Sequence, residues 1–178
     1  MRSWPRFFIA GTIQGSLQGV RTISQEYRSS LRALIIKQYP NVGLYCPEEI
    51  LRNRLGLQER EIRESFVALS SAEVIRADAY NHPIRAVAQV FQELVRMAGE
   101  ADVLVAYLPD HQASMGTAME MWSAFENRKI VVTISNMRQN LAVVSTSTII
   151  VPDIAAFERL LTNRWLDQEF EARQVRAE

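Results

Sequence analysis

Short apolar runs alternate along this chain with longer stretches in which apolar residues recur every three or four positions. The runs that predict strands are residues 7–10, 42–45, 103–107, 130–134 and 148–151. Continuous rather than alternating hydrophobicity indicates strands that are covered on both faces. Strands of this kind separated by helices are typical of a parallel sheet between helical layers. We therefore predict an α/β three-layer sandwich with a five-stranded, mostly parallel sheet and helices on both faces.

Helical periodicity lies between these runs. It predicts helices over residues 24–37, 82–98, 116–127 and 153–164, the last with Asp153 as its N-cap. The charged stretch 50–81 fits a solvated helix, and a lid over a ligand site is the alternative. We place the domain at residues 1–164 and a charged helical tail at 165–178, which either packs back or meets a partner subunit.

Length and composition narrow the class of protein. A chain of 178 residues with 48% hydrophobic and 22% charged residues suits one globular domain. Lys plus Arg and Asp plus Glu number 20 each, so the chain has no net positive charge that would attract nucleic acid or an anionic membrane. No apolar stretch is long enough to span a bilayer, and the N-terminus lacks a signal-peptide pattern. A cytoplasmic protein is the expectation.

Cofactor chemistry has little support in the sequence. The single cysteine, Cys46, allows no intramolecular disulfide. The two histidines, His82 and His111, lie far apart, and no Cys or His cluster has metal-ligand spacing. We therefore expect neither a metal site nor an organic cofactor.

The loop after the first predicted strand has an unusual composition. It contains Gly11, Thr12, Ile13, Gly15 and Ser16. Ligands of open parallel sheets bind beyond the carboxyl ends of the strands. Glycines there let the backbone approach a ligand, and the two hydroxyls can donate to an oxyanion. A simple turn accounts for the loop equally well.

The loop after the strand at 103–107 carries the strongest candidates. Ser114 and the free amides near Gly116 form an anion site at a helix N-terminus. Glu120 lies about one turn inside that helix, where burial would raise its pKa and the helix dipole would lower it. The alternative is an ordinary glutamate that stabilises the helix dipole. After the strand at 130–134, Met137 offers an apolar wall for a base or sugar, or else belongs to a polar connection.

Three segments carry a resemblance to a known family: "FFIAGTIQGS" at 7–16, "ADVLVAYLP" at 101–109 and "SMGTAMEMWSA" at 114–124. Together they resemble the nucleoside 2-deoxyribosyltransferase superfamily. The closest likeness is to its branch of 2'-deoxynucleoside 5'-phosphate N-hydrolases and CMP N-glycosidases. The resemblance spans most of the chain from Phe7 to Val132, and the central insertion and the C-terminal part match poorly. It implies a flavodoxin-like sandwich.

The resemblance also implies residue roles. Glu120 matches the family's catalytic glutamate, which attacks C1' or stabilises the positive charge that develops there. Ser114 falls where the phosphate hydrolases have serine and the transferases have aspartate, which would repel a 5'-phosphate. The loop from Gly11 to Ser16 resembles the phosphate and sugar loop. The substrate implied is a small molecule, a nucleoside 5'-monophosphate, and the reaction is hydrolysis of its N-glycosidic bond.

Several positions depart from the family pattern. Gln14 stands where the hydrolases have arginine, and Phe7 and Phe8 supply no hydroxyl where relatives have a first-strand tyrosine. Leu94 falls at the position of the family's aspartate, which makes its neighbour Glu93 a candidate acid or simply a solvated residue. Base exchange by a deoxyribosyltransferase, and a nucleotide-sensing module without turnover, therefore stay open as alternatives.

The resemblance further implies a homo-oligomer, because relatives complete their pockets across subunit contacts. The candidate interfaces are the loop around Met137 and the tail around Trp165.

Overall fold

A computed structural model describes residues 5–13, 24–56 and 59–175, and its centre is a parallel sheet. The strands are β1 (Arg6–Gly11), β2 (Gly43–Tyr45), β3 (Val103–Leu108), β4 (Ile130–Ser135) and β5 (Ile149–Val151). Their order is β2-β1-β3-β4-β5, and every pair is parallel. This is the order of flavodoxin-like folds. All five predicted strands are confirmed, and the mostly parallel sheet proves to be parallel throughout the described residues.

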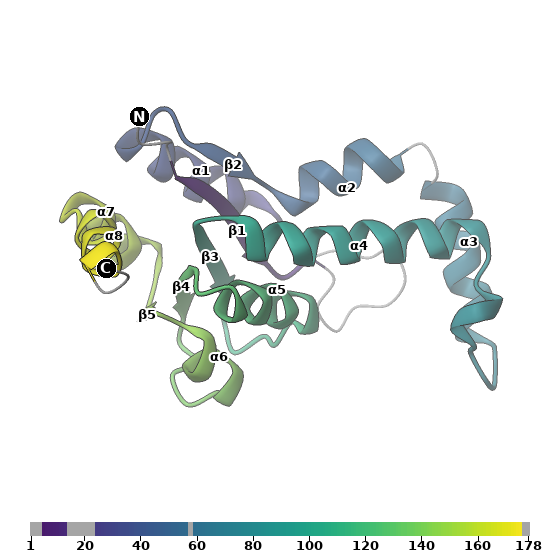
Figure 1. Cartoon of the computed structure of the whole chain (residues 1–178). Helices are drawn as coiled ribbons and strands as arrows, with labels where there is room; N and C mark the ends of the chain where they lie inside the picture. Colours follow the sequence, from purple (N-terminus) through teal and green to yellow (C-terminus); the bar gives the residue numbers. More distant parts are fainter. Residues whose placement is uncertain (1–4, 14–23, 57–58, 176–178) are drawn as a thin grey trace.

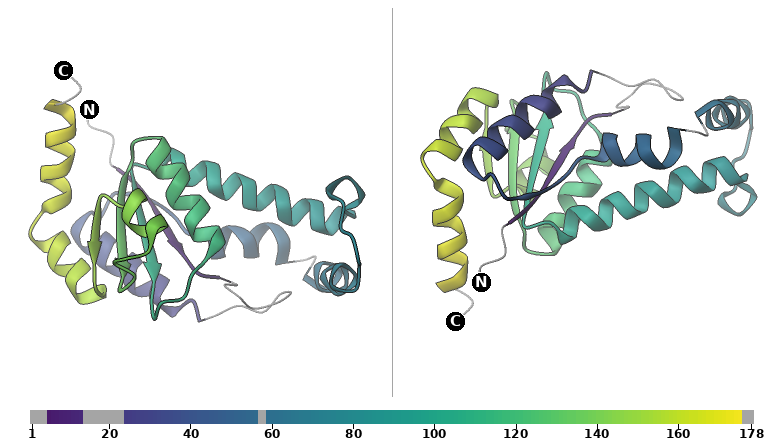
Figure 2. Two further views of the ribbon diagram at one scale, coloured as in Figure 1. Left: turned by 90° about the horizontal axis from the view of Figure 1, so that it is seen from below. Right: turned by 90° about the horizontal axis from the view of Figure 1, so that it is seen from above.

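Helices cover both faces of the sheet (Figures 1 and 2). One face carries α1 (Glu26–Gln38), α7 (Ile154–Thr162) and α8 (Trp165–Val175); the other carries α4 (His82–Glu100), α5 (Met115–Glu126) and α6 (Leu141–Thr146). Alternate residues of β1 enter the two cores: Phe7 and Ile9 pack on the α1 side, and Phe8 and Ala10 on the α4 side. All four are fully buried, which explains the continuous apolar run.

The stretch 50–81 holds more structure than the predicted single helix. It contains most of α2 (Pro47–Leu55), all of α3 (Glu59–Ser70) and a short turn, η2 (Ala77–Ala79). Figures 1 and 2 show α3 beside the N-terminal end of α4, which extends well beyond the sheet, and α2 alongside the middle of α4. Asn81 joins α3 to α4: its Oδ1 caps α4 by accepting from the Ile84 N–H at 3.2 Å, and its Nδ2 donates to Ser65 Oγ at 2.8 Å.

The helices predicted from periodicity all form, with small shifts at their ends. The Asp153 carboxylate accepts from the Ala156 N–H at 2.7 Å, so the predicted N-cap is confirmed. Helix α6 was not predicted. Its six residues are too few to show a period, and its cap, Asn140, lies in a segment that we interpreted as a polar loop.

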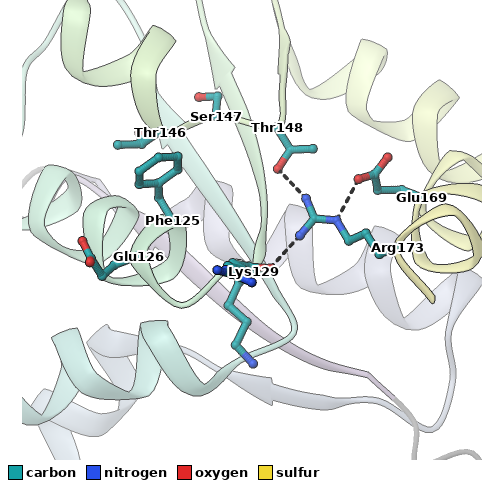
Figure 3. Close-up of a pocket in the computed structure, with 9 residues that line it drawn as sticks. Phe125, Glu126, Lys129, Thr146, Ser147, Thr148, Glu169 and Arg173 are labelled. Atoms are coloured by element: carbon teal, nitrogen blue, oxygen red, sulfur yellow. Dashed lines mark hydrogen bonds and ion pairs between the residues drawn. The ribbon is translucent and has the colours of Figure 1, made fainter. Parts of the chain in front are cut away.

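Helix α8 packs against the sheet domain. Leu166 is fully buried in the core on the α1 side. Figure 3 shows Arg173 between three elements: it bonds Glu169 of α8, Thr148 Oγ1 before β5 and the carbonyl oxygen of Arg128 after α5. The bond to the Arg128 carbonyl measures 2.6 Å. The division into a domain at 1–164 and a tail at 165–178 stays a prediction.

We expect Arg173→Met to lower the free energy of unfolding by about 1–3 kcal/mol, because hydrogen bonds to a charged group are lost and their acceptors are left unpaired. Urea denaturation followed by circular dichroism measures this. Arg164→Met is the matched control, since Arg164 is exposed and its side chain pairs with Asp167 of its own helix region. An equal effect of the two substitutions would contradict the bridging role of Arg173.

Candidate functional site at the carboxyl ends of β1 and β3

The chain leaves β1 and β3 toward opposite edges of the sheet, which opens a crevice at their carboxyl ends. Gly11, the last residue of β1, pairs in register with Tyr107 of β3. Thr12 follows directly and is 1% exposed. Two of the predicted loop residues therefore lie where the topology places a ligand site. Ile13 is half-buried beside them, whereas Gly15 and Ser16 lie outside the described residues.

Gly11 is required by the packing of Tyr27. A Cβ atom on Gly11 would collide with the Tyr27 hydroxyl and would lie 2.8 Å from ring carbon Cζ. The Tyr27 ring also stacks on Tyr107, with ring centroids 4.5 Å apart. The glycine therefore lets an aromatic side chain of α1 lie directly over the end of β1.

Arg28, the next residue of α1, is a buried cation. Its Nη1 donates to the Ile9 carbonyl at 2.5 Å and its Nη2 to the Gly11 carbonyl at 3.0 Å. Its Nε donates to Gln25 Oε1 at 2.7 Å. The guanidinium also lies 5.0 Å from the centroid of the Tyr27 ring, in cation–π distance. These contacts fix the positive charge beneath the end of β1.

Glu120 of α5 faces the same region and is 5% exposed. Burial raises the pKa of its carboxyl group to about 8, and the positive charge of Arg28 opposes that rise. No described residue donates a hydrogen bond to this carboxylate. At neutral pH Glu120 therefore exchanges between its protonated and its ionised form.

Two buried hydroxyls at the end of β1 have no hydrogen-bond partner among the described residues, Thr12 Oγ1 and Tyr27 OH. Buried polar groups are normally paired, so an unpaired one needs an explanation such as a ligand or a water molecule. Burial raises the pKa of Tyr27, which keeps its hydroxyl protonated and able to donate. Both hydroxyls flank Gly11, and the Tyr27 hydroxyl interacts electrostatically with Glu120. This arrangement can bind a polar group of a small molecule.

The N-terminus of α5 is capped by Ser114. Its Oγ accepts from the Thr117 N–H at 3.3 Å and from the Thr117 hydroxyl at 3.0 Å. The hydroxyl proton of Ser114 stays free to donate, so the cap is compatible with an anion site but does not require one. Gly116 has a packing role, because a Cβ atom there would lie 3.2 Å from the Phe91 ring of α4.

Met137 lies in the turn after β4 and is 8% exposed, within the core on the α4 side. Its N–H donates to Ser135 Oγ at 3.0 Å, and that hydroxyl donates to the Leu108 carbonyl at 2.8 Å. These bonds hold the turn against the end of β3. A contact of Met137 with a base stays a prediction.

Glu93 lies apart from this group. Its carboxylate forms a two-pronged ion pair with Arg54 of α2, at 2.5 and 2.9 Å. Among the described charged groups, Arg28 and not Glu93 shifts the pKa of Glu120. Leu94 is 1% exposed and belongs to the core. Glu120 thus interacts electrostatically with Arg28 and Tyr27, both of which lie against Gly11, whereas Glu93 has a partner elsewhere.

A cavity of about 520 Å³ lies at the opposite edge of the sheet, before β4 and β5 (Figure 3). The end of α5, the residues before β5, and α8 line it, and none of the predicted site residues does. This cavity contains neither the unpaired hydroxyls nor the buried carboxyl group, so the candidate site lies at the carboxyl ends of β1 and β3 instead. The described chain contains no cluster of metal-ligating side chains and no helix long and apolar enough to cross a membrane.

The sequence analysis singled out neither Arg28 nor Tyr27 as a site residue. One signal was present: Arg28 lies three positions before Leu31 and seven before Ile35, both fully buried. A charged residue on the buried face of a helix indicates a specific partner, because an unpaired buried charge is strongly destabilising.

We expect Glu120→Gln to stabilise the protein at alkaline pH. The pKa of Glu120 is raised on folding, from 4.5 to about 8, so its contribution to stability is full below about pH 4.5 and is lost as the pH rises through 8. Glutamine cannot ionise, so at pH 8 the variant should exceed the wild type by on the order of 2–4 kcal/mol.

Thermal melting of both proteins between pH 4.5 and 8.5 measures this difference. Glu126→Gln, an exposed position on the same helix, should leave the pH dependence unchanged. Parallel melting curves for wild type and Glu120→Gln would show that burial does not affect this carboxyl group.

Comparisons with known proteins show which fold the chain shares with solved structures. No family model and no curated protein matches the sequence. Among solved structures, a 2-deoxyribosyltransferase from the bacterium Bacillus psychrosaccharolyticus is similar with a TM-score of 0.53 at 14% identity, over 86% of this chain and 90% of that one. A conserved protein from Enterococcus faecalis reaches a TM-score of 0.54 at 19% identity, over 91% of this chain and 99% of that one. At such low identities, the similarity shows that the chain shares its α/β fold with a 2-deoxyribosyltransferase.

Proposed function

We propose that this protein hydrolyses the N-glycosidic bond of a nucleoside 5'-monophosphate and releases the free base and a sugar phosphate. The observation that carries the proposal is Glu120, a buried carboxyl group with a pKa of about 8 that interacts electrostatically with Tyr27, one of two buried side chains at the end of β1 whose hydroxyls have no partner among the described residues. Perturbed carboxyl groups in such crevices are typical of catalytic sites. A solved structure with the same fold is a 2-deoxyribosyltransferase, which supports chemistry at a nucleoside C1'.

The proposed reaction needs a carboxylate near C1'. As the C1'–N bond breaks, its electron pair leaves with the base, which takes up a proton, and positive charge develops on the sugar ring. Ionised Glu120 stabilises that charge or bonds to C1'. A water molecule then adds its hydroxyl group to C1', any bond between C1' and Glu120 breaks with its electron pair returning to the carboxylate, and the second proton of the water balances the one taken up by the base. Thr12 and Tyr27 would bind sugar hydroxyls. The rate should rise with pH as Glu120 ionises, toward a plateau above about pH 8.

The N-terminus of α5 suits the 5'-phosphate. Ser114 precedes Glu120 by six positions, about 9 Å along the helix axis. Its free hydroxyl proton and the amides of the first turn favour an anion. The loop with Gly11, Thr12 and Ile13 would bind the sugar, and the predicted contribution of Gly15 and Ser16 lies outside the described residues.

Two alternatives remain. Base exchange by a deoxyribosyltransferase would use the same Glu120, but Ser114 in place of an acidic side chain favours a phosphorylated substrate. A nucleotide-sensing module without turnover is favoured by Glu93, whose carboxylate is paired with Arg54 and leaves no acid identified beside Glu120.

The deciding experiment is chromatography of free bases after incubation with each ribo- and deoxyribonucleoside 5'-monophosphate. We expect base release by the wild type, a loss of at least 100-fold in Glu120→Gln because the carboxylate acts at C1', and full activity in Glu93→Gln. Addition of a second free base distinguishes exchange, which yields a new nucleoside. Binding that raises the melting temperature without base release would establish the sensing module. Release that survives Glu120→Gln would exclude the mechanism.

We also propose that a second copy of the chain packs on the outer face of α5. Met115, Met119 and Trp122 recur on one helical face and are 84%, 50% and 54% exposed. The Trp122 ring contacts Phe125, with centroids 5.6 Å apart. Exposed apolar stripes of this kind mark interaction surfaces.

The earlier candidates are less suited, because Met137 is buried and Trp165 packs against the core of its own chain. Met115 directly follows Ser114, so a copy on this face would border the proposed phosphate site.

We expect Trp122→Glu to convert an oligomer into a monomer, because a charge would be buried at the apolar contact. Light scattering after size-exclusion chromatography measures the mass. Val175→Glu, at an exposed position at the end of α8, serves as the control and should keep the wild-type mass. A wild-type mass of one chain, or an unchanged mass in Trp122→Glu, would contradict this interface.

A further inference from the structure

The cavity of about 520 Å³ between α5, α8 and the residues before β5 lies apart from the proposed catalytic site. Its volume is in the range of small-molecule sites. Residues 146–148 bring three hydroxyl groups to one wall, and Figure 3 shows Arg173 reaching this wall from α8. The exposed ring of Phe125 forms an apolar edge that continues to Trp122. The cavity therefore combines polar groups with an aromatic surface.

Thr148 and Arg173 hold hydrogen-bond donors that the chain itself does not use. Thr148 Oγ1 accepts from the Val131 N–H at 3.0 Å and from Arg173 Nη2 at 3.3 Å, so both of its acceptor positions are taken. No described residue accepts the proton of this hydroxyl. The three bonds of Arg173 described above take one N–H group each, and a guanidinium has more. Both side chains therefore keep donors for a ligand.

The two helices that end at this cavity offer few acceptors. Helices normally end in unpaired carbonyl groups, whose partial negative charge disfavours an anion. At the end of α5, the carbonyl groups of Ala124 and Phe125 each accept a backbone N–H at 2.9 Å. At the end of α6, the Val143 carbonyl accepts the N–H and the hydroxyl of Ser147, at 3.1 and 2.6 Å. These carbonyl groups are thus already paired, which leaves mainly donors in the cavity.

Arg128 is a cation in a backbone conformation that favours glycine. It directly follows the C-cap of α5 and has a φ of 55°, which is unfavourable for a residue with a side chain. Its guanidinium has no partner in the described part of the chain. Arg164 takes the same position after α7 with a φ of 56°, but it pairs with Asp167 at 2.7 Å. An arginine at such a position without an internal partner indicates a partner outside the chain.

Positive charge exceeds negative charge around the cavity. The lining contains three cations and two carboxylates: Arg128, Lys129, Arg173, Glu126 and Glu169. Glu169 is already bound to Arg173 at 2.7 Å. Glu126 is exposed, so water and salt screen its charge. Lys129 lies 4.0 Å from Asp102, which also pairs with Arg6. The charge balance therefore favours an anionic group.

We propose that this cavity is a second binding site, for a small molecule that joins a phosphate group to an aromatic ring. Phosphate oxygens are strong acceptors and suit the unused donors of Thr148 and Arg173 and the guanidinium of Arg128. The ring would pack on Phe125 at the apolar edge. The site lies at the opposite edge of the sheet from the proposed catalytic site, so the inference goes beyond the proposed reaction and does not depend on it.

The test is a ¹H–¹⁵N NMR titration of the full chain with phenyl phosphate, followed through the backbone amides of residues 128–129 and 147–148. We expect saturable shifts at these amides. Inorganic phosphate should bind more weakly, because it lacks the ring, and phenol should give no saturable shift there, because it lacks the charge. In Arg128→Gly the affinity should fall at least tenfold, because charge-assisted hydrogen bonds are lost. Its melting temperature should not fall, because glycine suits the left-handed conformation.

Three further variants show where the ligand binds. Arg164→Gly is the matched control, since it replaces an arginine of the same conformation elsewhere, and it should keep the wild-type affinity. Glu126→Gln removes a like charge and should tighten binding by about twofold to fivefold. Ser114→Ala alters the proposed catalytic site and should leave the shifts at residues 128–129 and 147–148 unchanged.

Three outcomes would overturn the proposal. The first is the absence of saturable shifts at these amides with phenyl phosphate. The second is an unchanged affinity in Arg128→Gly. The third is a set of shifts confined to the N-terminus of α5 and abolished by Ser114→Ala, which would place the anion at the proposed catalytic site alone. Base release from nucleotides bears on none of these outcomes, so the second site and the proposed hydrolase fail separately.

Discussion

The charge of Arg28 at the end of β1 is the constraint on which the rest of this site depends. A guanidinium without water must find acceptors, and it finds them in the carbonyl groups of Ile9 and Gly11, which lie beyond Phe8, the last residue of β1 that pairs with β2. Glu120 is likewise removed from water, and its pKa shows the penalty of that burial. The positive charge of Arg28 opposes that penalty, so the two buried groups influence each other although the carboxyl group is largely protonated at neutral pH.

Packing around this pair restricts the choice of neighbouring residues. Tyr27 lies between Gly11 and Tyr107, so an aromatic stack and a missing side chain are needed at the same point. Gly116 lets α5 approach Phe91 of α4, which holds the helix that carries Glu120. Dense packing transmits small displacements, so these glycines fix the position of the carboxyl group as much as its nearest contacts do.

Much of the fold could be predicted from the sequence, because buried parallel strands are continuous apolar runs and long helices show their period. The six-residue helix α6 is too short to show a period. The charges along α2 and α3 obscured the boundary between these two helices. Motifs located Glu120 and Ser114, whose positions depend on one local strand–loop–helix unit. Arg28 and the pairing of Glu93 with Arg54 depend on contacts between distant segments, and hydrophobic patterns carry no information about those.

The edge strands β2 and β5 are only three residues long. Each therefore presents few free backbone donors and acceptors, although a parallel sheet of this kind offers two open edges. Because both edge strands are short, the sheet is protected from pairing with strands of another molecule, which is a common route to aggregation. Association of copies is thereby directed to side chains on helices, where sequence can specify which surfaces meet.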